Sequence, residues 1–138
     1  MAVVVDCSVT MAWFFEGEVT PYTEAVLDAV SASAGAAPAL WALEVSNALA
    51  SVLRKKSFAA ERLGEVHAKL QRLHWELEPL DLARSLGPIL GLAQKHGLTS
   101  YDATYLEMAK RRELPLATLD KALAVAAKAE RVKLFKPA

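Results

Sequence analysis

The sequence predicts an α/β fold built on a mostly parallel sheet. Short apolar segments rich in β-branched or alternating residues recur along the chain, and segments with helical spacing of apolar residues separate them. Strands that alternate with helices in this way usually pair in parallel, because each helix carries the chain back across the sheet. No repeat, linker or low-complexity tract interrupts the pattern, so residues 1–138 are expected to form one domain.

The expected elements follow one another closely. Strands are expected at residues 2–5, around 36–38, at 75–80, beginning at 114–116, and at 132–135. Helices are expected at residues 21–34, 40–56, 58–73, 82–96, 98–112 and 121–129.

Capping residues set several of these boundaries. Thr20 followed by Pro21 is typical of a helix start, because proline suits the first helical position. Ser57 and Asp81 are expected to cap the helices that follow them, and Gly97 to end the helix before it.

The composition indicates a folded protein, with 54% apolar residues and 7% aromatic residues. No apolar stretch is long enough to cross a membrane and the N-terminus lacks a secretion signal, so a soluble cytoplasmic protein is expected. Cys7 is the only cysteine, which excludes an internal disulfide and a cysteine-based zinc site.

The charges balance, with 16 basic and 16 acidic residues, but they are unevenly distributed. Residues 1–53 contain no Lys or Arg, and basic clusters follow at 54–56, 110–112 and 128–133. An acidic half folded onto a basic half would place carboxylates beside a rim that attracts phosphate. The alternative is that the cations at 54–56 and 110–112 only stabilise helix C-termini.

Four acidic residues are expected at one edge of the sheet. Asp6 ends the first strand, Asp120 follows a later strand, Asp102 lies in the first turn of a helix, and Glu44 lies one turn into another. In open parallel sheets, ligands bind outside the carboxyl ends of the strands. These four side chains are therefore expected to converge there.

Each acid also has a structural interpretation. Asp102, three residues after Thr99, fits a capping box, and Asp120 and Glu44 could cap their own helices. Asp6 is harder to explain in this way, because it ends an apolar strand with no cation nearby in sequence. The agreement of four acids on one edge favours a shared site.

The chemistry of such a site points to a metal ion. Close carboxylates repel one another, and a divalent cation relieves that repulsion; Mg²⁺ and Mn²⁺ prefer oxygen ligands. A metal that activates water and holds phosphate oxygens suits phosphodiester hydrolysis, and two ions about 4 Å apart would clamp both sides of the displacement.

At these residues the sequence resembles the PIN-domain ribonucleases, and among them the VapC toxins of bacterial toxin–antitoxin pairs. The resemblance covers essentially the whole chain and rests on VVVDCSV, ALWALEVSNAL, LTSYDATYLEMAK and LPLATLDKAL. It implies a three-layer α/β/α sandwich over about five strands. It also implies a Mg²⁺- or Mn²⁺-dependent endoribonuclease centred on the acids Asp6, Glu44, Asp102 and Asp120.

The resemblance implies further roles. Asp6 and Asp102 match the nearest metal ligands, with Glu44 and Asp120 completing the cluster. Three residues match supporting positions outside the four acids: Ser8, which would hold the Asp6 loop, Asn47 and Thr118. The implied partners are an RNA substrate, with a tRNA or ribosomal RNA loop as the family-level expectation, a cognate antitoxin and a second copy in a homodimer.

Other side chains have less specific expectations. Trp13, Phe14 and Phe15 either line the antitoxin groove or pack in the core. Cys7 is expected to be a small buried side chain with a raised pKa. The histidines show no metal-ligand spacing and are expected to be structural or exposed; they are His67, His74 and His96.

Two rival functions remain open. In a phosphatase of the haloacid-dehalogenase type, an Asp after the first strand is the nucleophile of a D-x-D-x-T motif, but Ser8 stands where the second acid should be. The domain might instead be a non-catalytic module whose acids only hold a metal or a basic peptide. The presence of all four acids argues against that degenerate form.

Overall fold

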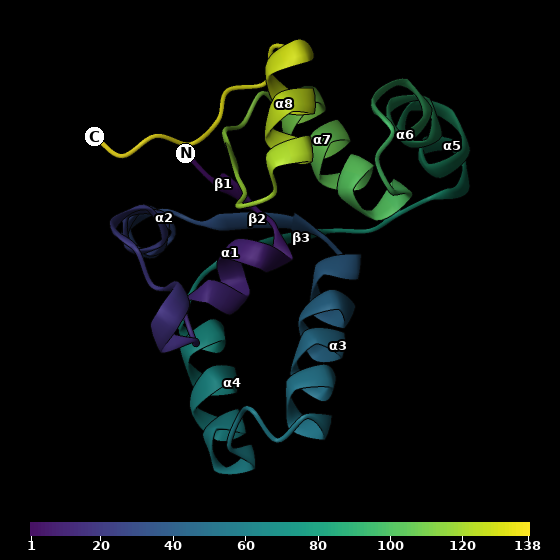
Figure 1. Ribbon diagram of the computed structural model, residues 1–138. Coiled ribbons are helices and arrows are strands. Elements are labelled where there is room, and N and C mark those ends of the chain that lie inside the picture. Colours follow the sequence, from purple (N-terminus) through teal and green to yellow (C-terminus); the bar gives the residue numbers. More distant parts are fainter.

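A computed structural model describes residues 1–138 as a four-stranded parallel sheet with helices on both faces (Figure 1). The strand order is β3-β2-β1-β4. The strands are β1 (Val3–Val5), β2 (Gly35–Pro38), β3 (Trp75–Glu78) and β4 (Leu116–Ala117). All three pairings are parallel, which confirms the predicted fold class.

The centre of the sheet is apolar on both faces. Every residue of β1 is buried, and Val4 packs in one hydrophobic cluster while Val3 and Val5 pack in the other. This alternation follows from the two-residue period of a strand. Gly35 is required by the close approach of β3, because a Cβ at this position would lie 2.4 Å from the Trp75 ring.

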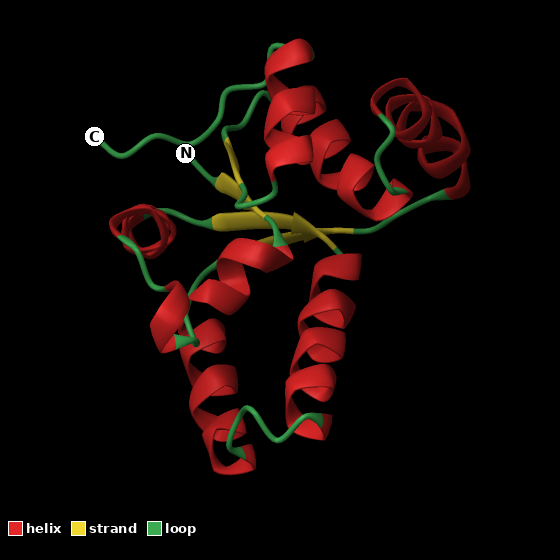
Figure 2. Cartoon of the chain, in the orientation of Figure 1, coloured by secondary structure: helices red, strands yellow, loops and turns green.

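Helices cover both faces and form the outer layers (Figure 2). One layer holds α1 (Cys7–Ala12), α2 (Pro21–Ala32), α3 (Leu40–Arg54) and α4 (Leu63–Arg72). Opposite lie α7 (Ser100–Arg112) and α8 (Lys121–Ala129), with α5 (Leu82–Arg84) and α6 (Leu90–His96) beside α7. None of the helices has the length and apolar character needed to span a membrane.

The sheet has four strands instead of about five. The last expected strand, 132–135, forms only a single parallel bridge between Leu116 and Leu134. The Leu116 amide donates to the Lys133 carbonyl, and the Phe135 amide donates to the Leu116 carbonyl. Because β4 has only two residues, the segment beside it cannot extend the ladder.

The helix expected at 58–73 begins later, at Leu63, after a 3-10 turn at Ala60–Arg62. Ser57 does not cap it, because its hydroxyl donates to the Val52 carbonyl of the preceding helix. Phe58 is buried in the core, and we attribute the delayed helix start to the insertion of this side chain.

The segment expected as one helix at 82–96 is helical throughout but not uniform. Between α5 and α6, residues Ser85–Ile89 form a π-helical turn that contains Pro88. Proline has no amide hydrogen, and a wide turn accommodates the missing bond. Asp81 caps the start of the segment by accepting from the Arg84 amide, and Gly97 ends it with a φ of 64°, as predicted.

The structure also corrects the start of the chain. Helix α1 follows Asp6 directly and was not predicted, and a 3-10 turn spans Glu16–Glu18. Trp13 and Phe14 are 7% and 3% exposed and pack in the core, although Trp13 also lines a hollow of about 340 Å³ with residues of α2 and α4. Burial favours the core interpretation for Trp13 and Phe14, while Phe15 is partly buried.

Candidate metal centre

Three of the four acids follow strands, and the fourth, Asp102, lies at the start of a helix that follows another helix. Asp6 follows β1 and caps α1, and Asp120 follows β4 and caps α8. Glu44 lies in the second turn of α3, after β2, and Asp102 in the first turn of α7. Parallel pairing of the strands places Asp6, Glu44 and Asp120 at the carboxyl edge of the sheet, and the charge of Asp102 acts on Asp6 and Glu44 there.

Asp6 is the most buried of the four, with 4% of its surface exposed. The Ser8 hydroxyl donates to its Oδ1 at 2.6 Å, the Val9 amide donates to the same atom at 3.1 Å, and the Thr118 hydroxyl donates to Oδ2. Burial nevertheless raises the pKa of Asp6, and the charge of Asp102 raises it further. The carboxylate is therefore held in place by hydrogen bonds, but no positively charged side chain pairs with it.

Ser8 and Thr118 also join the two loops that carry Asp6 and Asp120. The Asp120 amide donates to the Thr118 hydroxyl at 3.0 Å, and the Leu119 amide donates to the Ser8 hydroxyl at 3.1 Å. Each hydroxyl therefore contacts both loops. This geometry fixes the end of β1 relative to the end of β4.

Glu44 is half-buried and does not cap its own helix. Instead it accepts a hydrogen bond from the hydroxyl of Tyr105, whose ring is 1% exposed. Tyr105 lies three residues after Asp102 on α7, so this bond links two acid-bearing helices. Burial raises the pKa of Glu44, and the charges of Asp102 and Asp6 add to that effect.

A second link joins α3 to α1. The Trp41 indole Nε1 donates to the Thr10 hydroxyl at 2.9 Å, and that hydroxyl donates to the Asp6 carbonyl at 3.1 Å. Thr10 and Trp41 are both buried. Together with the Tyr105 and Thr118 bonds, this contact connects all four acid-bearing segments.

Asp102 is half-buried and Asp120 is exposed. The Asp102 amide donates to the Thr99 hydroxyl, so Thr99 is the cap of α7. Asp120 accepts from the Leu123 amide at 2.9 Å, which confirms its capping contact. Burial raises the pKa of Asp102, and the charge of Asp120 raises it further.

The acids lie close enough for their charges to raise the pKa values of Asp6, Glu44 and Asp102, but they do not form a complete set of ligands around one ion. No three His, Cys, Asp or Glu side chains come close enough together to surround one ion. Oxygens of Asp6, Glu44 and Asp120 are instead occupied by protein donors. Asn47 lies one turn beyond Glu44, is exposed, and makes no side-chain hydrogen bond within the protein.

The donor set fits a hard divalent cation. All four side chains offer carboxylate oxygens, the ligands that Mg²⁺ and Mn²⁺ prefer. The pKa values of Asp6, Glu44 and Asp102 are raised by burial and by mutual negative charge. A nearby cation would favour their ionised forms.

Cys7 lies beside this site without taking part in it. Burial, with the charges of Glu44 and Asp6, raises the pKa of its thiol to about 12. The thiol is therefore neutral near pH 7 and a poor nucleophile.

Sequence reasoning missed three supporting residues: Thr10, Trp41 and Tyr105. The position of Tyr105, one turn after Asp102 on the same helix, was a usable signal because such residues share a face. The Trp41–Thr10 contact joins residues 31 apart and leaves no local pattern.

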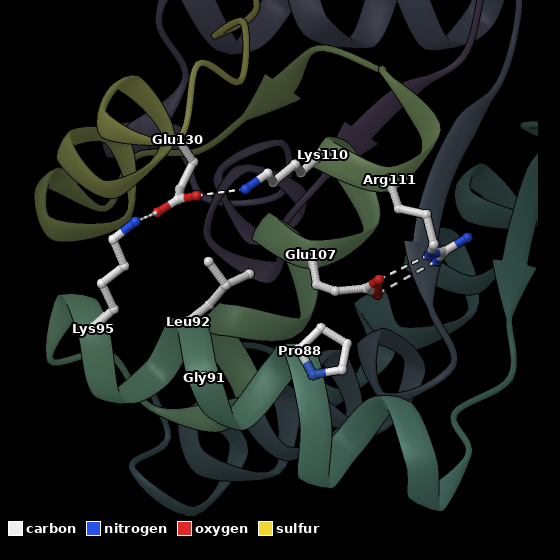
Figure 3. A pocket seen from close by; sticks show the side chains of 8 residues that line it. All are labelled: Pro88, Gly91, Leu92, Lys95, Glu107, Lys110, Arg111 and Glu130. Atoms are coloured by element: carbon white, nitrogen blue, oxygen red, sulfur yellow. Dashed lines mark hydrogen bonds and ion pairs between the residues drawn. The ribbon is translucent and has the colours of Figure 1, made fainter.

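A hollow of about 650 Å³ lies away from the acids, between α6, α7 and the end of α8 (Figure 3). There Glu130 pairs with Lys95 at 2.8 Å and Lys110 at 2.6 Å, and Glu107 pairs with Arg111 at 2.8 Å. His96 also lies 2.6 Å from Glu130, a structural contact. The basic cluster 110–112 is thus ion-paired and does not form a free basic rim.

The fold and the site define an α/β domain with an acidic carboxyl edge and a buried aspartate after its first strand. The PIN domain family profile matches residues 3–129. The chain belongs to the PIN domain family.

Two solved structures are similar to this chain, each with a TM-score of 0.65 and 23% sequence identity. One is PAE2754 from Pyrobaculum aerophilum, where the match covers 91% of this chain and 87% of that chain. The other is FitAcB from Neisseria gonorrhoeae, where it covers 99% and 98%. These likenesses support the fold. A search of curated proteins finds no match.

Proposed function

We propose that this PIN domain, comprising residues 1–138, is a Mg²⁺- or Mn²⁺-dependent endoribonuclease. The acids Asp6, Glu44, Asp102 and Asp120 form its catalytic centre. The observation that supports this most is the state of Asp6, a carboxylate that is 4% exposed, lies near the charges of Asp102 and Glu44, and has no cation paired with it. Structural acids that are buried to this degree are normally paired.

Within this proposal each residue has a defined task. Asp6 and Asp102 hold the cation, with Glu44 and Asp120 completing the cluster. When bound, the metal supplies an activated water and neutralises phosphate charge. Ser8 and Thr118 orient the Asp6 carboxylate through their hydroxyls, and no side chain of the site serves as a covalent nucleophile.

In this proposal the enzyme is the toxin of a toxin–antitoxin pair and acts in the cytoplasm. A helix of the antitoxin binds in a groove between α3 and α4. Two adjoining hollows of about 330 Å³ and 420 Å³ share Ala42, Val45, His67 and Leu70, and most of the residues lining them are apolar. We prefer this groove to a site at Trp13–Phe15, because Trp13 and Phe14 are buried in the core.

The position of the groove argues for one occupant, an amphipathic helix with a basic extension. Val45 lines the groove and follows Glu44 on α3, so a chain that leaves the groove at this level and crosses α3 reaches the acids. A basic extension would complement their charge and place an Arg or Lys among the carboxylates. Such an occupant would block the metal centre.

The protein also forms a homodimer in this proposal, through exposed leucines of the α5–α6 segment. Leu82, Leu86 and Leu90 recur every four residues and are 74%, 64% and 38% exposed. Residues 85–94 contain no charged side chain, which is unusual for a solvated helix face. An uncharged leucine stripe is complementary to itself, as a twofold interface requires.

The rival functions receive less support. Ser8 donates a hydrogen bond to Asp6, but it cannot act as the general acid that a haloacid-dehalogenase-type phosphatase needs. An aspartyl-phosphate trap would reveal such an enzyme, because the proposed nuclease forms no covalent intermediate. A non-catalytic module would bind metal without cleaving RNA.

The substrate is a structured RNA, with a tRNA or ribosomal RNA loop as the expected target. The deciding experiment incubates purified protein with structured RNA in EDTA, then restores Mg²⁺ or Mn²⁺. We expect cleavage to stop in EDTA and return with either metal. Undiminished cleavage in EDTA would overturn the metal-dependent mechanism, and no cleavage under any condition would favour the binding module. Sequencing the RNA fragments after induced expression would then identify the target.

A further inference from the structure

The cations of this chain fall into paired and unpaired groups. Those of the 84–112 region are largely held in ion pairs, such as Arg84 with Glu107 and Arg112 with Glu76. Residues 54–62, by contrast, carry four Lys and Arg and a single Glu. Positive charge at this place is therefore not neutralised locally.

These residues form the outer end of the α3–α4 hairpin, which projects away from the sheet (Figure 1). Arg54, Lys55 and Lys56 are exposed and take part in no ion pair. Arg62 lies 3.8 Å from Glu65, donates a hydrogen bond to the Phe14 carbonyl at 3.1 Å, and places its guanidinium over the Phe58 ring. We call Arg54, Lys55 and Lys56 the basic tip.

A polar face of α3 connects the acids to the basic tip. Glu44, Asn47, Ser51 and Arg54 are spaced by three, four and three residues, which places them on one side of the helix. Asn47 is exposed and Ser51 half-exposed, and Asn47 has no partner within the protein. The apolar residues that line the groove, such as Val45 and Leu49, belong to the other side of α3.

We propose that this polar face of α3 and the basic tip bind the sugar–phosphate backbone of the RNA substrate. The proposal rests on the nuclease function above and extends it by naming where the RNA runs. Glu44 and Arg54 are ten residues apart, so about 15 Å of helix separates the acids from the tip. A short stretch of RNA strand spans that distance.

The chemistry of the surface matches an RNA backbone. Lys and Arg at the tip contact phosphates, while the amide of Asn47 and the hydroxyl of Ser51 suit phosphate oxygens or ribose hydroxyls. Contacts of this kind carry no base specificity. They hold the strand in position while the acids act at one phosphodiester bond.

The test compares two charge-matched triple variants. The first replaces the basic tip with Arg54→Gln, Lys55→Gln and Lys56→Gln. The control replaces exposed lysines without ion pairs on and after α8, on the opposite side of the sheet, with Lys128→Gln, Lys133→Gln and Lys136→Gln. Both remove three positive charges, so a general effect of net charge is the same in the two proteins.

We expect the tip variant to raise KM for a structured RNA at least tenfold and to leave kcat within about twofold. Its binding of that RNA in EDTA should show a log-log salt slope shallower by about 2 than that of the wild type. Mn²⁺ affinity and the unfolding midpoint should be unchanged, and the control variant should match the wild type throughout. Asn47→Ala should raise KM several-fold by itself.

Equal behaviour of the two triple variants, in KM and in salt slope, would overturn the proposal while leaving the nuclease function standing. A wild-type protein that binds Mn²⁺ but neither binds nor cleaves RNA would overturn both. A lower kcat or weaker Mn²⁺ binding in the tip variant would also overturn it, because the basic tip would then act on the metal centre and not on the RNA.

Discussion

The hydroxyl of Tyr105 donates a hydrogen bond to the Glu44 carboxylate and joins two helices whose residues are 61 apart in sequence. Tyr105 is fully buried, and its own pKa is raised strongly by burial and by Glu44. The phenol therefore stays protonated and remains a donor at all working pH values. Its position, one turn from Asp102, makes the bond a brace between two acids of the site.

Tyr105→Phe should therefore lower kcat/KM for RNA about tenfold, within the range found when a partner of a metal ligand is removed. Unfolding by denaturant should show a cost of only about 1 kcal/mol, because the ring keeps its packing. Tyr101→Phe is the matched control on the same helix, since Tyr101 is 65% exposed. Equal kinetics in the two variants would show that the brace has no functional role.

The α3–α4 groove can be tested by placing a charge in it. Ala42 lines the groove and is exposed, so Ala42→Glu should leave the fold intact but abolish binding of the proposed antitoxin. Calorimetry measures the affinity. Ala32→Glu, at an exposed position on α2, is the control that should bind normally. Tight binding by Ala42→Glu would place the antitoxin elsewhere.

The leucine stripe makes a prediction about assembly. Leu86→Glu should convert a dimer into a monomer in sedimentation experiments, because two like charges would face one another across the twofold axis. Val125→Glu on α8 has nearly the same starting exposure, 68% against 64%, and should remain dimeric. If the wild type sediments as a monomer, or Leu86→Glu stays dimeric, the stripe is not the interface.

Glu130 predicts a pH dependence of stability. Hydrogen bonds from Lys110, Lys95 and His96 lower its pKa from 4.5 to about 2. Because the folded-state pKa is lowered, the carboxylate stabilises the fold above about pH 4.5, and that contribution disappears as the pH falls toward 2.

Glu130→Gln should therefore cost about 1–2 kcal/mol of unfolding free energy at pH 7, since its lysine partners are largely exposed and screened. The difference from wild type should shrink steadily between pH 4.5 and pH 2 in urea titrations. A difference that is independent of pH would show that packing, and not charge, is what the substitution removes.

Much of the fold could be predicted because its signals are local. The valine run of β1, the Thr20–Pro21 start of α2 and the Gly97 end of α6 were all read from neighbouring residues. Where contacts between distant segments determine an element's boundaries, the sequence led to wrong predictions. Burial of Phe58 accompanies the later start of α4, and the two-residue β4 leaves the 132–135 segment with a single bridge.

The candidate site likewise contains residues that the sequence predicts and contacts that it does not predict. The acids were found because strand ends and helix starts are visible in the sequence, and parallel pairing brings those ends to one edge. Helix α1 has only six residues, too few to show a helical period in the sequence. The contacts of Trp41 with Thr10 and of Tyr105 with Glu44 bridge distant segments, so only the folded chain reveals them.

The most direct measurement titrates Mn²⁺ into metal-free protein by calorimetry, for the wild type and for Asp6→Asn, with thermal unfolding of both metal-free forms. We expect the wild type to bind and Asp6→Asn to bind at least tenfold more weakly. Its unfolding temperature should be equal or higher, because asparagine still caps α1 while like-charge repulsion is relieved. Unchanged Mn²⁺ affinity together with a large loss of stability would show that Asp6 supports the fold alone, and would contradict the proposed metal centre.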